Sequence, residues 1–237
     1  MTSPSFVFQR ANLETCAQAA DIVVVIDVLR AFSTAAYAFA AGAERILLVS
    51  TVDEALALKQ RLPHALIVGE VNGFSVPGFD FCNSPSQIVG QDLRGRTLIQ
   101  RTTAGTQGVV RAQRARHILA TAFCTARATA MYLHRFSGHT ITFVITGQRA
   151  EGGGEEDAVC ADYIEALLRG ENPSPGSFIQ RVRESSTARK FLALGSPDFP
   201  PSDLDYCTAV DRFDFAMVVN REGDLFVLRA VAPLTQV

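Results

Sequence analysis

The chain has 237 residues, of which 48% are hydrophobic and 19% charged, with 22 basic against 24 acidic side chains. This length fits one sizeable domain or two small ones, and the apolar share is enough to build a hydrophobic core. The composition excludes intrinsic disorder, which requires fewer aliphatic residues and a stronger net charge. A formal net charge of −2 gives no electrostatic reason to expect nucleic acid or an acidic membrane surface as a partner.

The strands and helices are predicted from alternating β-branched runs and Ala/Leu-rich stretches. Residues 22–26 are apolar on both faces, as in a strand at the centre of a covered parallel sheet. An Ala-rich helix over 31–41 follows, with Gly42 as its end. Thr51 and Glu54 have the spacing of a capping box, which predicts a helix through residue 61. Further strands are predicted at residues 45–50, 65–69, 97–101, 117–120 and 140–146, with helices at about 105–114 and 125–134 between them.

The pattern changes after residue 155. A helix to residue 169 is followed by a Pro/Gly/Ser-containing break at 172–177 and by a charged helical stretch to about residue 194. Residues 215–219 and 225–230 have the pattern of a hairpin. We therefore expect a three-layer α/β/α fold with a mainly parallel or mixed sheet. The simplest division is a single domain over 1–237, with 171–237 as a possible C-terminal subdomain.

The basic residues and cysteines indicate little by themselves. Only Lys59 and Lys190 are lysines; the arginine bias suits bidentate recognition of carboxylate or phosphate but equally reflects genome composition or thermal adaptation. The five cysteines contain no Cys-x-x-Cys pair, so neither a zinc ribbon nor a thioredoxin-like redox pair is indicated. Residues 1–10 lack the pattern of a signal peptide, and no apolar run approaches the roughly 20 residues that span a bilayer. We expect a soluble, cytoplasmic protein with reduced cysteines, and a homo-oligomer is compatible with the sequence.

Polar side chains gather at one predicted edge of the sheet. In an open parallel sheet, ligands bind beyond the carboxyl ends of the strands. Asp27 and Glu70 each follow a predicted strand directly, and the turn 102–106 follows another. Asp27 is either a helix N-cap or a Mg²⁺ ligand, because hard cations prefer carboxylate oxygens. No predicted helix follows Glu70 directly, so helix capping does not explain this carboxylate. The acidic run 155–157 lies at a predicted helix start, where negative charges are favourable whatever the function.

Two further features at this edge have alternative interpretations. The turn Thr102-Thr103-Ala104-Gly105-Thr106 presents hydroxyls and backbone N–H groups at a helix start, which favours a bound phosphate or sulfonate; an ordinary threonine N-cap is the alternative. Arg30 follows Asp27 in the same strand-to-helix connection, where it either neutralises an anionic substrate or forms a surface ion pair.

Several known chemistries are excluded by spacing. The chain has no GxxxxGK[ST] phosphate loop, no strand-linked GxGxxG and no GxSxG. No cysteine is followed by the arginine of a Cys-x5-Arg loop. Leu29 stands where an aspartyl-phosphate haloacid-dehalogenase motif has its second aspartate. The four histidines are scattered, which makes a histidine-rich zinc site improbable.

Five segments in this order resemble the 2-phosphosulfolactate phosphatase family, known as ComB, over about residues 20–220. They are Val25-Ile26-Asp27-Val28-Leu29-Arg30-Ala31, the loop from Gly69-Glu70 to Asn83-Ser84-Pro85, Thr102-Thr103-Ala104-Gly105-Thr106, Glu156-Asp157-Ala158-Val159-Cys160-Ala161 and Asp211-Arg212-Phe213-Asp214. The resemblance implies a three-layer α/β/α fold and Mg²⁺-dependent hydrolysis of a phosphate monoester on a small sulfonated hydroxy acid.

The chain departs from the family pattern at three places. Val71-Asn72 stands where the family has Arg-Gly, and Ala104 replaces an asparagine. The family's Gly-Ser/Ala-Phe-x-Asn segment is Thr121-Ala122-Phe123-Cys124-Thr125 here. The lost arginine and amide are groups that would hold a sulfonate, whereas Arg30, Arg101 and the turn amides remain available for a phosphate dianion.

We therefore expect a Mg²⁺-dependent phosphatase for a small acidic phosphate ester, with 2-phosphosulfolactate as the substrate that the resemblance implies. The expected catalytic residues are Asp27, Arg30 and Glu70, and the expected metal ligands are Asp27, Glu70 and Asp157, directly or through water. Substrate contacts are expected from Asn83, Ser84, Thr102, Thr103, Gly105 and Thr106. Alternatives are a phosphatase for a different substrate and a non-catalytic anion-binding or assembly protein with a degenerate site.

Overall fold

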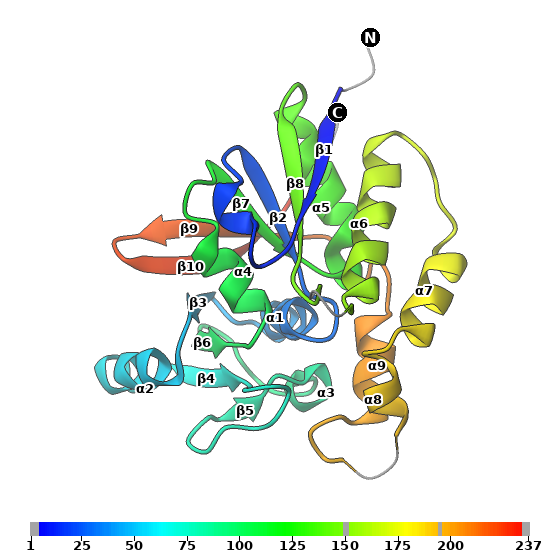
Figure 1. The fold of residues 1–237 in the computed structure, drawn as a ribbon. Coiled ribbons are helices and arrows are strands. Elements are labelled where there is room, and N and C mark those ends of the chain that lie inside the picture. Colours follow the sequence, from blue (N-terminus) through cyan, green and yellow to red (C-terminus); the bar gives the residue numbers. More distant parts are fainter. Residues whose placement is uncertain (1–4, 149–151, 194–195, 234–237) are drawn as a thin grey trace.

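Ten strands form one mixed sheet in the computed structural model, which describes residues 5–148, 152–193 and 196–233 (Figure 1). Their order across the sheet is β1-β8-β2-β7-β9-β10-β3-β6-β4-β5. The strands are β1 (Val7–Ala11), β2 (Ile22–Ile26), β3 (Arg45–Val49), β4 (Leu66–Gly69), β5 (Phe81–Cys82), β6 (Thr97–Arg101), β7 (His117–Thr121), β8 (Thr140–Ile145), β9 (Ala216–Glu222) and β10 (Leu225–Val231).

The described residues also form nine α-helices and three short 3₁₀ helices. The α-helices are α1 (Ala31–Ala40), α2 (Val52–Arg61), α3 (Pro85–Ile88), α4 (Gly105–Arg111), α5 (Ala126–Leu133), α6 (Glu155–Leu168), α7 (Pro175–Glu184), α8 (Arg189–Leu192) and α9 (Pro201–Cys207). The 3₁₀ helices are η1 (Cys16–Gln18), η2 (Phe123–Thr125) and η3 (His134–Phe136). None of the described helices is long and apolar enough to cross a membrane.

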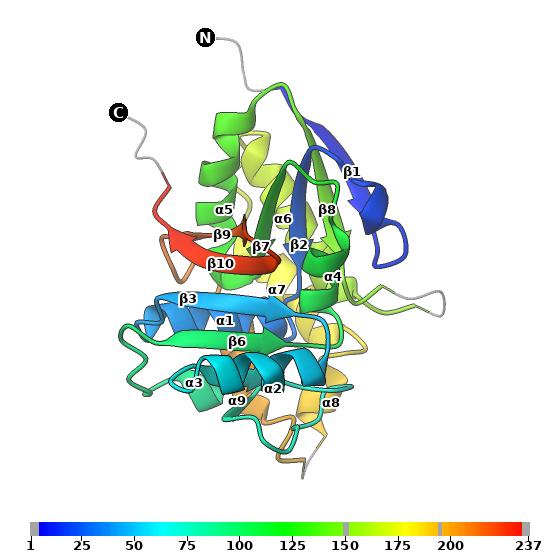
Figure 2. The same ribbon diagram turned by 90° about the vertical axis from the view of Figure 1, so that its left-hand side faces the viewer.

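The sheet consists of two parallel halves joined by an antiparallel hairpin. Strands β1, β8, β2 and β7 are parallel to one another, and so are β3, β6, β4 and β5. The hairpin of β9 and β10 lies between these halves and pairs antiparallel with β7 and β3. Strand twist accumulates across so many strands, and Figure 2 shows β2 and β8 running steeply while β3 and β6 lie nearly crosswise. The carboxyl ends of β2 and β6 therefore reach the same corner of the molecule.

Helices cover both faces of the sheet. In β3 and β6, Leu47 and Ile99 pack in the hydrophobic cluster that contains Ala55 of α2. Their neighbours Ile46 and Leu98 belong to the main core on the other face, together with residues of α1. This alternation along each strand, with α2 and α1 on opposite sides in Figure 2, gives the expected three-layer α/β/α arrangement.

The sequence predicted most of the regular elements near the site. The predicted strands over residues 22–26 and 97–101 are confirmed in full, and the capping box of Thr51 and Glu54 is present. The hairpin is confirmed with longer strands. The helical stretch expected to about residue 194 consists of α7 and α8, which end at Glu184 and Leu192; residue 194 itself lies outside the described residues. Among the described strands and α-helices, four were not predicted: β1, β5, α3 and α9.

Candidate active site

A pocket of about 300 Å³ lies at the corner where the two halves of the sheet meet. Asp27 and Leu29 reach it from the connection between β2 and α1, and Glu70 reaches it from the residue after β4. Thr103 comes from the turn after β6. The opposite wall includes Phe191 of α8 and Phe199, which precedes α9. The pocket is thus formed by strand ends on one side and by the C-terminal helices on the other.

Asp27 is a buried carboxylate at the start of α1. Its Oδ1 accepts a hydrogen bond of 2.9 Å from Ala31 N, the first residue of the helix. The N-cap position of α1 is Arg30, so Asp27 is not the N-cap that the sequence allowed, although it bonds to the helix start. Burial raises the pKa of Asp27 to about 6. The negative charge of Glu70 also raises it, whereas hydrogen bonds from Ala31, Thr146 and Gly105 oppose the shift. No basic side chain among the described residues pairs with Asp27, which leaves its charge available to a cation.

Glu70 is held in one orientation by the loops around it. Its Oε1 accepts from Thr103 N, and its Oε2 accepts from Gly73 N and, at 2.9 Å, from Thr103 Oγ1. The Glu70 backbone is fixed as well, because its N donates to Arg101 O and its O accepts from Arg101 Nη1. Since these contacts tie the loop after β4 to the end of β6, Glu70 presents a pre-oriented carboxylate to the pocket.

Asp157 and Glu156 form a buried acidic pair at the first turn of α6. Asp157 Oδ1 accepts from Val28 N at 2.8 Å, and Oδ2 accepts from Gly147 N at 2.9 Å and from Thr146 Oγ1 at 3.2 Å. Burial raises the pKa of Asp157 well above its usual range, and the charges of Glu156 and Asp27 add to the shift. Burial likewise raises the pKa of Glu156, whose Oε2 has no hydrogen-bond partner among the described residues. Neither side chain lines the pocket, and the charge of Asp27 contributes to the raised pKa of both.

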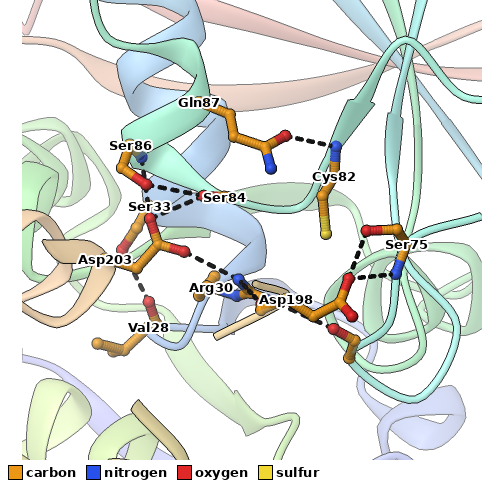
Figure 3. Close-up of polar contacts among 11 residues, drawn as sticks. Val28, Arg30, Ser33, Ser75, Cys82, Ser84, Ser86, Gln87, Asp198 and Asp203 are labelled. Carbon is orange, nitrogen blue, oxygen red and sulfur yellow. Dashed lines mark hydrogen bonds and ion pairs between the residues drawn. The ribbon is translucent and has the colours of Figure 1, made fainter. Parts of the chain in front are cut away.

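Arg30 lines the pocket but its guanidinium is largely committed to the protein (Figure 3). Its Nη1 bonds to Asp203 Oδ2 at 2.8 Å and to Asp198 O at 2.6 Å, and its Nη2 bonds to Gly73 O at 3.1 Å. The rings of Phe191 and Phe199 each lie 5.2 Å from its Cζ. Arg30 therefore forms a buried ion pair, in place of the surface ion pair considered from the sequence.

Asn83 and Ser84 have different environments although they are adjacent. Asn83 lines the pocket, and its buried Oδ1 has no hydrogen-bond partner among the described residues. Ser84 is fully buried behind it, and its Oγ lies 2.8 Å from Asp203 Oδ1. Ser86 N donates to the same Asp203 oxygen at 2.9 Å. Figure 3 shows how Asp203 joins this loop to Arg30.

The threonines after β6 bond mainly within their own turn. Thr106 N donates to Thr102 Oγ1 at 3.0 Å, and Thr102 N donates to Thr106 Oγ1 at 2.9 Å. Both side chains are buried and neither lines the pocket. Gly105 packs against Asp27, so close that an added Cβ would lie 2.9 Å from Asp27 Oδ2. Thr103 is the exception, because it reaches both the pocket and Glu70.

The structure thus brings together part of the predicted site. The pocket is lined by Asp27, Arg30, Glu70, Asn83 and Thr103, whereas Ser84, Thr102, Gly105, Thr106 and Asp157 lie behind this lining. Sequence reasoning missed the wall formed by Thr187, Lys190, Phe191 and Phe199, and it missed Asp203. These residues belong to a segment with no recognisable motif; the rarity of lysine was the one available signal at Lys190.

The donor set favours a hard cation over a soft one. No group of three or more His, Cys, Asp or Glu side chains within the described residues is arranged as a metal cluster. The pocket instead offers the carboxylates of Asp27 and Glu70 and the unpaired amide oxygen of Asn83. Mg²⁺ is commonly held by only one or two carboxylates, with waters and substrate oxygens in its remaining positions. The oxygens present fit that mode of binding.

The fold and the pocket define a three-layer α/β protein with an acidic site for a small polar ligand. The chain belongs to the 2-phosphosulpholactate phosphatase family, whose model matches residues 8–222. It is 38% identical to a probable 2-phosphosulfolactate phosphatase of Bacillus subtilis (strain 168), over 90% of this chain and 92% of that protein. Proteins of the same name from Carboxydothermus hydrogenoformans and Thermosynechococcus vestitus are 48% and 32% identical, over 62% and 81% of this chain and 60% and 86% of theirs.

Proposed function

We propose that this chain is a Mg²⁺-dependent phosphatase that hydrolyses 2-phosphosulfolactate, or a closely related acidic phosphate monoester, to the free hydroxy acid and phosphate. The observation that supports this proposal best is the meeting of Asp27 and Glu70 in one pocket, although they follow strands in opposite halves of the sheet. The names of the relatives agree with it.

Asp27 and Glu70 would hold the metal ion, with the Asn83 amide oxygen as a further oxygen donor. When bound, Mg²⁺ neutralises charge on the phosphate oxygens and helps to orient the attacking group. Asp157 lies behind Asp27, where its Oδ1 accepts a hydrogen bond from Val28 N in the connection that carries Asp27. Because Asp157 also accepts from Gly147 N, it joins the loop after β8 to this connection and positions Asp27.

The remaining pocket residues bind and orient the substrate. Arg30 is held by Asp203 and by the Asp198 carbonyl, so this part of the pocket wall occupies a fixed position and needs no rearrangement when the substrate binds. The Phe191 and Phe199 rings form an apolar wall on the same side, which limits water near the reacting phosphate. The pocket of about 300 Å³ suits a small ester rather than a nucleic acid or a membrane surface.

The direct test is phosphate release from 2-phosphosulfolactate with Mg²⁺ and with EDTA. We expect turnover that requires Mg²⁺ and that falls by at least about a hundredfold in Asp27→Asn, because the charged oxygen is lost from the site. Asp53→Asn is the matched control, since Asp53 is an exposed residue of the first turn of α2. Full activity of Asp27→Asn, or turnover in EDTA, would contradict the metal assignment.

Metal binding has a readout that does not depend on turnover. A ligand that binds only the folded state raises its stability, so Mg²⁺ is expected to raise the melting temperature of the unmodified chain but not that of Asp27→Asn. Binding of anions without any dependence on Mg²⁺, together with no phosphate release, would instead indicate a non-catalytic protein.

We also propose a reducing, cytoplasmic setting for this activity. All five cysteines are free and buried, and they behave as small core side chains in this fold. Fractionation of the native host, with the chain recovered in the cytoplasmic fraction, is the corresponding measurement.

A further inference from the structure

The cations that line the pocket differ in how far their charge is already neutralised. Arg30 and Lys190 are the two basic side chains of the lining. Arg30 is paired with the buried carboxylate of Asp203. Lys190 forms no ion pair with any described residue, whereas Lys59, the other lysine of the chain, is paired with Asp80. Lys190 is therefore the one lining cation of the described structure whose charge is available to a ligand.

The position of Lys190 is set by the packing of α8. Ala188 and Phe191 are buried in a small cluster with Leu204 of α9, and Ala188 N is capped by Ser185 Oγ at 3.1 Å. Residues 187, 190 and 191 are spaced three and four apart, so they share one side of a helical turn. All three line the pocket. Lys190 is thus directed to the pocket by the anchored turn that carries it, although its own side chain is exposed.

A substrate with an anionic group beside its phosphate needs such a cation to compensate its charge in this pocket. Asp27 and Glu70 carry two negative charges, which one divalent cation offsets, and the Arg30 charge is offset by Asp203. A phosphate dianion with a second anionic group would then enter a pocket with no other compensating charge. A charge-assisted hydrogen bond from an ammonium group to that second group is roughly twice as strong as a neutral hydrogen bond.

We propose that Lys190 is a specificity-determining residue that binds the second anionic group, a sulfonate or carboxylate, of the phosphate ester. This inference rests on the proposed phosphatase function and goes beyond it by assigning the discrimination between esters with and without an anionic group beside the phosphate to one side chain of α8. The phosphate group lies at the strand ends near Asp27 and Glu70, and the second group lies toward the C-terminal wall.

The experiment compares kcat/KM for 2-phosphosulfolactate and 2-phosphoglycolate with kcat/KM for ethyl phosphate, which lacks a second anionic group. In Lys190→Met, kcat/KM for the two acidic esters is expected to fall by about tenfold to a hundredfold more than kcat/KM for ethyl phosphate. This fall is expected to come mainly from a higher KM for the two acidic esters. Lys190→Arg is expected to recover most of the preference, since it restores the charge. Arg189→Met is the matched control, because Arg189 is the exposed neighbour on α8 and does not line the pocket.

The outcomes separate this inference from the proposed function. If Lys190→Met lowers kcat/KM for all three esters by the same factor, or changes none of them, Lys190 does not bind the second group and the inference is wrong. An equal loss of preference in Arg189→Met would also overturn it, because a diffuse surface charge would then account for the effect. If the unmodified chain hydrolyses none of the esters, the proposed function fails first, and that result is seen before any variant is made.

Discussion

Arg30 and Asp203, 173 positions apart in the sequence, form a 2.8 Å ion pair in which the side chains are only 2% and 0% exposed. Every other ion pair between described residues has two partly exposed partners. This buried pair ties α9 to the start of α1, and through Ser84 and Ser86 it also fixes the loop that carries Asn83. The candidate site therefore depends on a carboxylate that does not line it.

Replacing Asp203 should destabilise the fold strongly. Asp203→Ala leaves the Arg30 charge buried without its partner and removes the acceptor of Ser84 and Ser86, so we expect a loss of about 3–5 kcal/mol in the free energy of unfolding. Urea denaturation followed by circular dichroism measures it. The control is Asp205→Ala on the same helix, whose ion pair with Arg183 is exposed and is expected to contribute less than about 1 kcal/mol. Similar losses in both variants would show that burial of the Arg30 pair is not the cause.

The Gly105 position should tolerate no side chain. An added Cβ would lie 2.6 Å from Ala31 Cβ and 2.9 Å from Asp27 Oδ2, so Gly105→Ala must displace Asp27 or α4. We expect a destabilisation of about 1–3 kcal/mol together with a loss of phosphatase activity. Gly176→Ala in α7 is the control, because nothing lies within 4 Å of its added Cβ and helix propensity favours alanine there. A fully active Gly105→Ala protein would contradict the close approach of this turn to Asp27.

The elements around the site that depend on local sequence were predictable, whereas the meeting of distant segments was not. The apolar strand before Asp27 and the capping box at Thr51 depend on neighbouring residues, and both were predicted with nearly correct boundaries. We expected Asp27 and Glu70 at one site because the carboxyl ends of parallel strands share an edge. In the structure, however, antiparallel strands join the two halves of the sheet that carry them. They meet because the sheet twists, a property of ten strands together that no local pattern contains.

The rest of the site could not be predicted because its signals are long-range. Asp203 is one of many acidic residues, and only its burial against Arg30 distinguishes it. Thr102 and Thr106 have the residue types expected of an anion-binding turn, but their hydroxyls bond to each other's backbone. Whether a hydroxyl faces a ligand or its own turn depends on side-chain orientation, which spacing alone does not determine.

The stability of the metal-free chain should depend on pH through Asp27. Its pKa is raised to about 6 in the fold, from a usual value of 3.8, so the folded state binds the proton more tightly than the unfolded state does. The contribution of Asp27 to stability therefore falls as pH rises from about 4 to about 6 and is constant above that range. In EDTA, we expect the melting temperature of the unmodified chain to fall relative to that of Asp27→Asn across this interval. A difference that stays constant, or that changes in the opposite direction, would contradict the raised pKa.

The cysteines should be unreactive while the chain is folded. All five are buried, and burial raises the pKa of Cys124 to about 12. Because the thiolate is the reactive form, a thiol with this pKa is almost entirely protonated at pH 8. A disulfide reagent such as DTNB is therefore expected to label no cysteine of the native chain within minutes at pH 8, and to label all five in concentrated urea.

A matched variant makes this measurement decisive. Ser186 is exposed in the connection between α7 and α8, so Ser186→Cys adds one accessible thiol without disturbing the core. We expect it to react with DTNB at a stoichiometry of one in the folded state, which shows that the reagent and the pH are adequate. If the unmodified chain reacts as fast as Ser186→Cys, local opening exposes the buried thiols on the timescale of the assay. The packing around Cys124 would then be far less stable than the burial of this η2 residue in the main core implies.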